Sequence, residues 1–209
     1  FGVFLLQSAF GQNIDYQGQI DSLLATKKYA AEAPGISICV QHKGEIIYER
    51  CFGLANIKKQ IPISTATKFN MASITKQFTA CCILILESEG KLATNDTIQK
   101  YLPELPNFGA AITLNHLLAH TSGIPDHLEV LGLKNNYPRK RLKADWTIQF
   151  LQQHLFLSFP PGERFAYSNT GYMLLAMVVE RITGTTLEAF AAQRIFEPLM
   201  MTDSRIANT

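Results

Sequence analysis

Residues 73–86 read SITKQFTACCILIL, a Ser-x-x-Lys sequence that leads directly into a long apolar segment. The run from Phe78 to Leu86 is apolar on nearly all sides of a helix, which predicts a buried helix. Helix positions i and i+3 share one face, so the Lys76 amine should reach the Ser73 hydroxyl. Ser73 would also lie near the positive end of the helix dipole. We therefore expect a reactive pair; the alternative is a core helix that Ser73 merely begins, with Lys76 extending to solvent.

A second Ser-x-x-Lys sequence, from Ser88 to Lys91, serves as an internal control. A chain of this length should contain roughly one such sequence by chance. Gly90 interrupts the second copy, and a glycine here is typical of a helix C-terminus. We expect Ser88 and Lys91 to lie at an exposed helix end with no chemical role.

Tyr167-Ser168-Asn169 supplies the groups that a reactive serine needs. A serine hydroxyl is a weak nucleophile until a base takes its proton. Lys76 could be that base as a neutral amine, or Tyr167 could serve as a phenolate that Lys76 stabilises; the coupled titration leaves both open. Asn169 can donate and accept at once, which suits a substrate amide. The alternative is a polar turn in which Asn169 or Thr170 caps the next helix.

Two other groups of residues resemble functional sites. His116 and His120 are four apart, a metal-ligand spacing, but no Glu follows His116 and two ligands do not make a site. We expect both to be structural, and we expect no metal or cofactor. The basic residues between Arg139 and Lys143 indicate a solvated loop; contact with an anionic cell-envelope polymer is the alternative.

Composition limits the possible classes of protein. The chain has 209 residues, is 47% hydrophobic and 17% charged, and carries a net charge of +2. It can therefore bury a sizeable core, and nothing in its charge indicates nucleic-acid binding. No run of 18 or more apolar residues occurs, so we expect no transmembrane helix.

The N-terminal residues and the cysteines bear on the compartment. Residues 1–11 resemble the apolar region and small-residue cleavage site of a signal peptide, which predicts a secreted or periplasmic protein. The alternative is an N-terminal core strand or helix. The four cysteines match no metal spacing and are expected to be free, buried thiols.

Periodicity predicts helices with one strong hairpin. Asp15 to Tyr29 should be an amphipathic helix. Ile36–Gln41 and Glu45–Phe52 should be strands joined by His42-Lys43-Gly44. Two strands make a marginal sheet, so either helices cover them or further strands lie beyond Thr209.

From Thr97 onward the chain indicates helices and loops. Thr113 should cap a helix that carries His116 and His120. Further helices are expected over Trp146–Leu157 and Tyr172–Ile182, the latter ending before Gly184. Thr185 and Glu188 should form a capping box for the last helix.

Four segments, FNMASITKQFTA, LLAHTSGIPD, PPGERFAYSNTGYMLLAMVVERITG and IFEPLMMTDS, together resemble the penicillin-recognising serine enzymes. They are most similar to the branch that holds class C β-lactamases, D-Ala-D-Ala carboxypeptidases, D-aminopeptidases and related esterases. The resemblance runs from about Pro34 to Thr209. It implies an α+β fold, with an antiparallel sheet flanked by helices, a mostly helical domain, and an active site between them.

The resemblance also implies residue roles. Ser73 would be the acylated nucleophile, and its N–H would form half of an oxyanion hole. Lys76 would be the partner of Ser73. Tyr167 would be the general base and acid, and Asn169 would contact the substrate amide. Residues 12–80 would be the N-terminal part of the α/β domain and residues 81–209 the helical domain.

One element of the family pattern has no counterpart in these 209 residues. The family carries a third motif, a Lys- or His-containing triplet ending in Gly, on a C-terminal strand of the sheet. We expect this chain to lack those C-terminal strands and to be weakly active or inactive alone, with an exposed sheet edge. Measurable penicillin turnover by the isolated chain would contradict this.

The preferred function is a serine hydrolase that cleaves an amide or ester bond through an acyl-enzyme on Ser73. Its substrate would be a β-lactam, a D-amino-acid peptide such as those of peptidoglycan, or a small ester, and residues from Asp126 to Ser158 should form part of the pocket rim. The alternative is a non-catalytic penicillin-binding-like sensor or scaffold. The sequence indicates no oligomeric state.

Overall fold

A computed structural model describes residues 15–25, 32–130 and 144–206 of the chain. By their internal contacts the residues divide into two units, 1–69 and 70–209. Ser73, at the start of its helix, belongs to the second unit, and the division into domains at residue 80 stays a prediction. The expected signal-peptide remnant, the basic cluster and part of the expected pocket rim lie outside the described residues.

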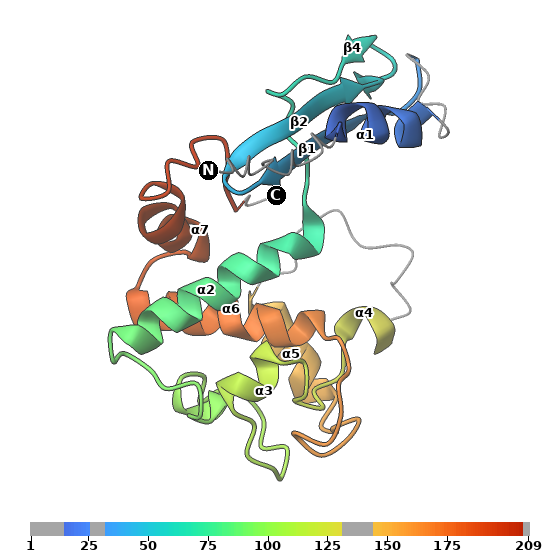
Figure 1. The fold of residues 1–209 in the computed structure, drawn as a ribbon. Coiled ribbons are helices and arrows are strands. Elements are labelled where there is room, and N and C mark those ends of the chain that lie inside the picture. Colours follow the sequence, from blue (N-terminus) through green and yellow to red (C-terminus); the bar gives the residue numbers. More distant parts are fainter. Residues whose placement is uncertain (1–14, 26–31, 131–143, 207–209) are drawn as a thin grey trace, which may run out of the picture. The chain divides into compact units, whose positions relative to one another are not determined.

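The first unit is built on a β-hairpin (Figure 1). Strands β1 (Ile36–His42) and β2 (Glu45–Phe52) pair antiparallel, with a register shift after Val40. The turn has two residues rather than the expected three, because His42 still pairs with Glu45. Lys43 and Gly44 both have positive φ, 50° and 87°, as in a type I′ turn whose twist matches that of the strands.

A helix and a second small ladder complete this unit. Helix α1 (Tyr16–Ala25) packs on β2, where the Tyr48 hydroxyl donates to Asp21 at 2.6 Å. The end expected at Tyr29 lies outside the described residues. Strands β3 (Leu54–Asn56) and β4 (Ile61–Pro62) form the second antiparallel pair.

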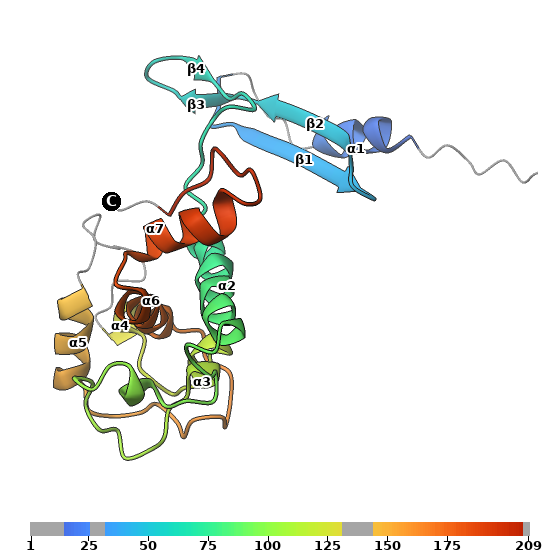
Figure 2. The ribbon, with the colours of Figure 1, turned by 90° about the vertical axis from the view of Figure 1, so that its left-hand side faces the viewer.

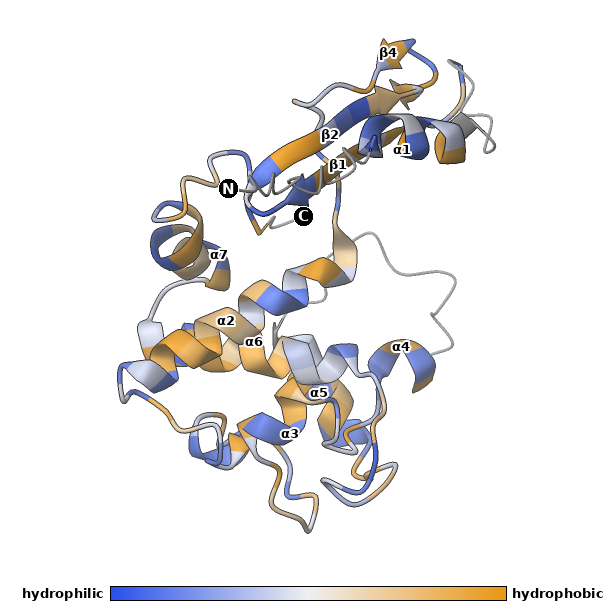
Figure 3. Cartoon of the chain, in the orientation of Figure 1, coloured by the Kyte–Doolittle hydropathy of each residue, from blue (hydrophilic) through white to orange (hydrophobic). Residues whose placement is uncertain are grey.

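The second unit is organised around two apolar helices that lie side by side, α2 (Thr75–Ser88) and α6 (Asn169–Thr183) (Figures 1 and 2). Their apolar character is plain in Figure 3. From α2 the buried side chains are Thr79, Cys82, Ile83 and Leu86, and from α6 they include Leu174, Leu175, Val178 and Val179. The expectation of a buried helix is met on one side of α2 only, since Leu84 is 53% exposed.

Shorter elements surround this pair. They are η2 (Ile98–Lys100), α3 (Leu114–Leu118), α4 (His127–Val130), α5 (Ala144–Gln153), α7 (Leu187–Ala191) and η4 (Ala192–Phe196). None of the helices in the described ranges is long and apolar enough to cross a membrane. All four cysteines are free thiols, as expected, but only Cys82 is buried: Cys39 is exposed, and Cys51 and Cys81 are partly exposed. Burial raises the pKa of the Cys82 thiol to about 12.

Helix ends agree with the sequence in part. Thr113 caps α3 as expected, but α3 ends at Leu118, so His120 lies outside it. Helix α5 ends at Gln153 rather than Leu157, and α7 is capped by Thr186 rather than Thr185. Helix α6 does end at Gly184, whose φ of 68° forms the left-handed cap.

Two loops next to α6 pair through their backbones. Ser158 N–H donates to Gly123 O, Gly162 N–H to Thr121 O, and Ala166 N–H to His120 O, each at 2.8 Å. The approach is close at Gly123, whose φ is 73° and where a Cβ would lie only 2.0 Å from the Phe159 carbonyl oxygen. This pairing carries the chain to Tyr167.

The pairing predicts unequal costs for two glycine-to-alanine substitutions. Gly184→Ala meets no atom within 4 Å, so it should lower the free energy of unfolding only by the left-handed penalty, about 1–2 kcal/mol. Gly123→Ala adds a clash with backbone and should cost about 3 kcal/mol or more in total. Urea unfolding followed by helical circular dichroism measures both values; equal losses would show that the loops do not approach this closely.

Candidate active site

Ser73 lies at a sharp bend where the chain enters α2. It is the middle residue of a short 3-10 helix, η1 (Ala72–Ile74), immediately before Thr75. Ala72 has a φ of 44°, a conformation that costs a non-glycine residue free energy, and the Asn70 side chain accepts its N–H at 2.9 Å. Backbone N–H groups in a first helical turn have no acceptor within the helix. The Ser73 side chain is exposed.

Lys76 is held by groups from both helices. Its Nζ lies 3.4 Å from Ser73 Oγ and donates to Asn169 Oδ1 at 2.9 Å. It also lies 4.8 Å from the Tyr167 ring centroid and 5.5 Å from that of Tyr172. The alternative in which Lys76 extends to solvent is therefore wrong.

Tyr167 completes a three-residue contact with Ser73. Its hydroxyl lies 2.7 Å from Ser73 Oγ, and its side chain is 45% exposed. Burial raises the pKa of the phenol, but hydrogen bonding to Lys76 and Ser73 and the charge of Lys76 outweigh burial. The net pKa lies below the ordinary value of 10.0. Tyr167 thus contacts both the Ser73 hydroxyl and the Lys76 side chain.

Asn169 is oriented by the start of α6. It is the first residue of that helix, and the cap is Ser168, whose Oγ accepts from Gly171 N–H at 3.1 Å. The alternative in which Asn169 or Thr170 caps this helix is wrong by one or two positions. The Asn169 side chain is thereby free to meet Lys76, while its N–H donates to Asp126 Oδ2.

The two histidines have separate surroundings. His116 Nδ1 accepts from Thr113 N–H at 3.3 Å and closes the capping box of α3. His120 has a φ of 58° and accepts from Ser168 N–H at 3.0 Å. Because α3 ends before His120, the i,i+4 spacing no longer places the two rings on one helix face. No group of three or more potential metal ligands occurs within the described ranges.

The control sequence has no comparable surroundings. Ser88 Oγ donates to the Ile85 carbonyl at 2.7 Å, and Lys91 pairs with Glu89 at 2.9 Å. The expectation of a structural helix end is confirmed.

Sequence reasoning missed three contributors to the site, namely His120, Asp126 and Ser168. Ser168 could have been found as the cap of α6, since serine favours that position. Asp126 Oδ1 accepts from Leu128 N–H at 3.0 Å, a local turn that an Asp at a helix start can indicate. No local sequence pattern around His120 indicates that it contacts Tyr167.

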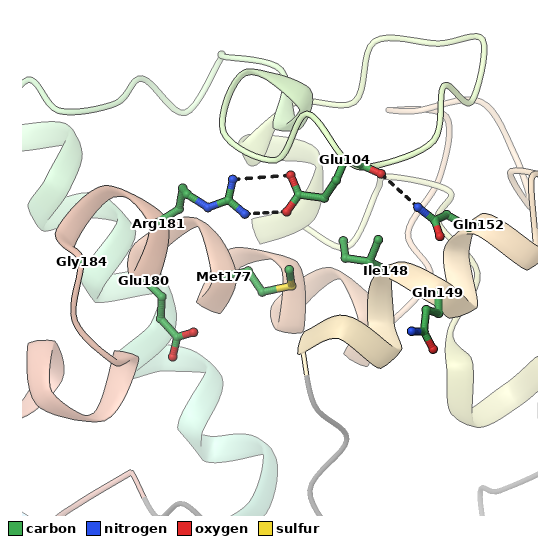
Figure 4. A pocket seen from close by; sticks show the side chains of 8 residues that line it. All are labelled: Glu104, Ile148, Gln149, Gln152, Met177, Glu180, Arg181 and Gly184. Atoms are coloured by element: carbon green, nitrogen blue, oxygen red, sulfur yellow. Dashed lines mark hydrogen bonds and ion pairs between the residues drawn. The ribbon is translucent and has the colours of Figure 1, made fainter.

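A hollow on this unit lies between α5 and α6, and none of its lining residues belongs to the Ser73 site (Figure 4). Two of its polar side chains pair with Glu104: Arg181 binds the Glu104 carboxylate, and Gln152 donates to the Glu104 carbonyl at 3.5 Å. These contacts join a loop to α6. The residues that line the hollow include no Ser, Thr, Cys or Lys.

Comparisons with known proteins agree with this geometry. The family model described as Beta-lactamase matches residues 20–209. Penicillin-binding protein 4* of Bacillus subtilis is 35% identical over 165 residues, covering 79% of this chain and 36% of that protein. Protein flp of Staphylococcus aureus is 33% identical over 202 residues, covering 93% of this chain and 39% of that protein.

Solved structures lead to the same family. The octameric penicillin-binding protein homologue from Pyrococcus abyssi is 34% identical with a TM-score of 0.77, covering 89% of this chain and 43% of that one. The D-amino acid amidase from Ochrobactrum anthropi SV3 is 28% identical with a TM-score of 0.69, covering 88% of this chain and 48% of that one. The chain thus spans less than half the length of each of these relatives.

The matched residues include both helices and every residue of the Ser73 site, and the α+β architecture is that of the β-lactamase/transpeptidase-like fold. This chain therefore belongs to the β-lactamase family, whose structural relatives here include penicillin-binding proteins and amidases.

Proposed function

We propose that the whole protein is a serine hydrolase that cleaves an amide or ester bond by transferring the acyl group to Ser73 Oγ. The observation that carries this proposal is the convergence on Ser73 Oγ of the Tyr167 hydroxyl at 2.7 Å and the Lys76 amine at 3.4 Å. A nucleophile with a base in hydrogen-bond reach, and a third group that orients the base, is the usual arrangement for covalent catalysis.

Of the two possible bases, we assign the role to Tyr167. The Tyr167 hydroxyl lies nearer to Ser73 Oγ, at 2.7 Å, than Lys76 Nζ does, at 3.4 Å. Burial raises the pKa of the phenol, but hydrogen bonding to Lys76 and Ser73 and the charge of Lys76 lower it overall, so the phenolate becomes easier to form. Tyr167 would take the Ser73 proton as Oγ attacks the carbonyl carbon, and would return it to the leaving group.

Asn169 and the Ser73 N–H would serve the substrate. The Asn169 amide group can donate to a substrate carbonyl while its Oδ1 retains Lys76. The Ser73 N–H, in the first turn before α2, would supply one donor to the oxyanion. The relatives named as a D-amino acid amidase and a D-stereospecific amidohydrolase support amides among the substrates. A β-lactam, a D-amino-acid peptide and a small ester all fit this chemistry. Secretion and a separate signal peptide stay predictions.

The acyl-enzyme is tested by labelling the whole protein with a fluorescent penicillin and with an activated ester probe. We expect a covalent label that is lost in Ser73→Ala and kept in the matched control Ser88→Ala. A label that persists in Ser73→Ala would place the nucleophile elsewhere. An absence of label with both probes on the folded wild type would favour the non-catalytic sensor or scaffold.

Lys76→Ala and Tyr167→Phe should each slow acylation by about a hundredfold or more, because each removes a proton-transfer or charge-stabilising group. Neither side chain is buried, since Tyr167 is 45% exposed and Lys76 is partly exposed, so thermal unfolding should change little. Stopped-flow labelling rates and melting temperatures separate the two effects. Near-normal acylation in both variants would overturn these assignments.

The pH dependence of acylation distinguishes the two bases. If Tyr167 acts as a phenolate, the rate should rise with pH until the phenol is ionised, and level off below the ordinary tyrosine pKa of 10.0. The residual rate of Tyr167→Phe should lack this rise. A rise that persists unchanged in Tyr167→Phe would assign the base to Lys76.

A further inference from the structure

His120 contacts the chain on both sides of Tyr167. Its carbonyl oxygen accepts from Ala166 N–H at 2.8 Å, and its Nδ1 accepts from Ser168 N–H at 3.0 Å. Between these two hydrogen bonds its ring lies against the Tyr167 ring, with centroids 4.6 Å apart and planes inclined by 33°. One residue thus fixes the positions before and after Tyr167 together with the ring itself.

The backbone of His120 makes this double contact possible. Its φ of 58° is a left-handed conformation that costs a non-glycine residue free energy. The conformation turns the carbonyl and the imidazole of one residue toward the same segment. The neighbouring loop pairs through Thr121 and Gly123 use backbone atoms alone. The imidazole is therefore not needed to hold the loops together, but it is needed for the Ser168 N–H and for the Tyr167 ring.

The contact works in one protonation state only. Nδ1 can accept the Ser168 N–H while it holds a lone pair; a proton there would set two donors against each other. The titratable and charged groups around the ring are Lys76 from α2, Asp126 before α4, Tyr167, and Tyr172 from α6, which lies 5.0 Å away. Burial lowers the pKa of His120, Lys76 lowers it further, Asp126 partly offsets both, and the net value lies below 6.5.

We propose that His120 is a positioning residue that holds the Tyr167 hydroxyl against Ser73 while its imidazole is neutral, and that its protonation releases Tyr167. This inference rests on the proposed acylation of Ser73. It deepens that proposal by assigning to His120 a loss of activity in acid that is separate from the titration of Tyr167.

Two substitutions separate positioning from general support of the fold. Asparagine tolerates a positive φ and offers an amide oxygen near the place of Nδ1, but it does not titrate. Alanine removes the acceptor and the ring. His154→Asn is the matched control, because His154 lies at the end of α5 with its Nδ1 against the Phe150 carbonyl. Melting temperatures verify that each variant folds.

The first measurement is the acylation rate of the whole protein over roughly pH 5 to 8. With Tyr167 alone titrating, the rate should fall about tenfold per pH unit toward acid. In wild type and His154→Asn the fall should steepen below the His120 pKa. We expect His120→Asn to keep the neutral-pH rate within about threefold but to lose the steepening, and His120→Ala to lose about tenfold or more at neutral pH.

The second measurement is independent of acylation. Hydrogen exchange of the peptide that contains Ala166 and Ser168 should be slow at neutral pH in wild type and in His120→Asn, and faster in His120→Ala. After correction for the pH dependence of intrinsic exchange, exchange of this peptide should become faster in acid in wild type but not in His120→Asn. The proposal would be overturned if wild type and His120→Asn had the same pH dependence of both acylation and hydrogen exchange. It would also be overturned if His120→Ala had the acylation and exchange rates of wild type. A wild type that labels with neither probe refutes the acyl-enzyme, and hydrogen exchange then decides the contact by itself.

Discussion

The site depends on one contact, the 2.7 Å approach of the Tyr167 hydroxyl to Ser73 Oγ. The two residues belong to segments far apart in the chain, and the packing of α2 against α6 brings these together. That packing is apolar: Cys82, Ile83 and Leu86 from one helix are buried with Leu174, Leu175 and Val178 from the other. The polar cluster therefore occupies one end of a hydrophobic helix pair, and burial of the apolar faces fixes the distance between reactive groups.

Lys76 lies where its charge opposes the dipole of α2, and the same charge acts on Tyr167. A cation in the first turn of α2 opposes the helix dipole, a cost of about 0.3–1 kcal/mol at an exposed site. Asn169 Oδ1 and the Tyr167 and Tyr172 rings offset that cost. The same charge lowers the pKa of Tyr167. Lys76 thus contacts Ser73, Tyr167 and Asn169, the residues proposed as nucleophile, base and substrate contact.

Strained backbone conformations occur next to the residues whose side chains must be oriented in the site. Five non-glycine residues in the described ranges have positive φ, and two of these, Ala72 and His120, flank the reactive groups. Ala72 precedes Ser73 and turns its hydroxyl to the surface, while His120 aims two acceptors at the segment around Tyr167. Each costs about 1–2 kcal/mol, which the apolar core of α2 and α6 must offset.

Local sequence rules determined the features that depend on neighbouring residues. The Ser73 and Lys76 pairing follows from helical geometry, the hairpin turn from Lys43-Gly44, and the end of α6 from Gly184. The residue types of Tyr167 and Asn169 indicated that they join this pair, and the resemblance to a family added their individual roles. Tertiary structure alone decided the partners of Asn169 and the contact of His120 with Ser168. Those contacts join α2, α6 and the loop before α4, and the packing of distant segments, which no local spacing encodes, sets the distances between them.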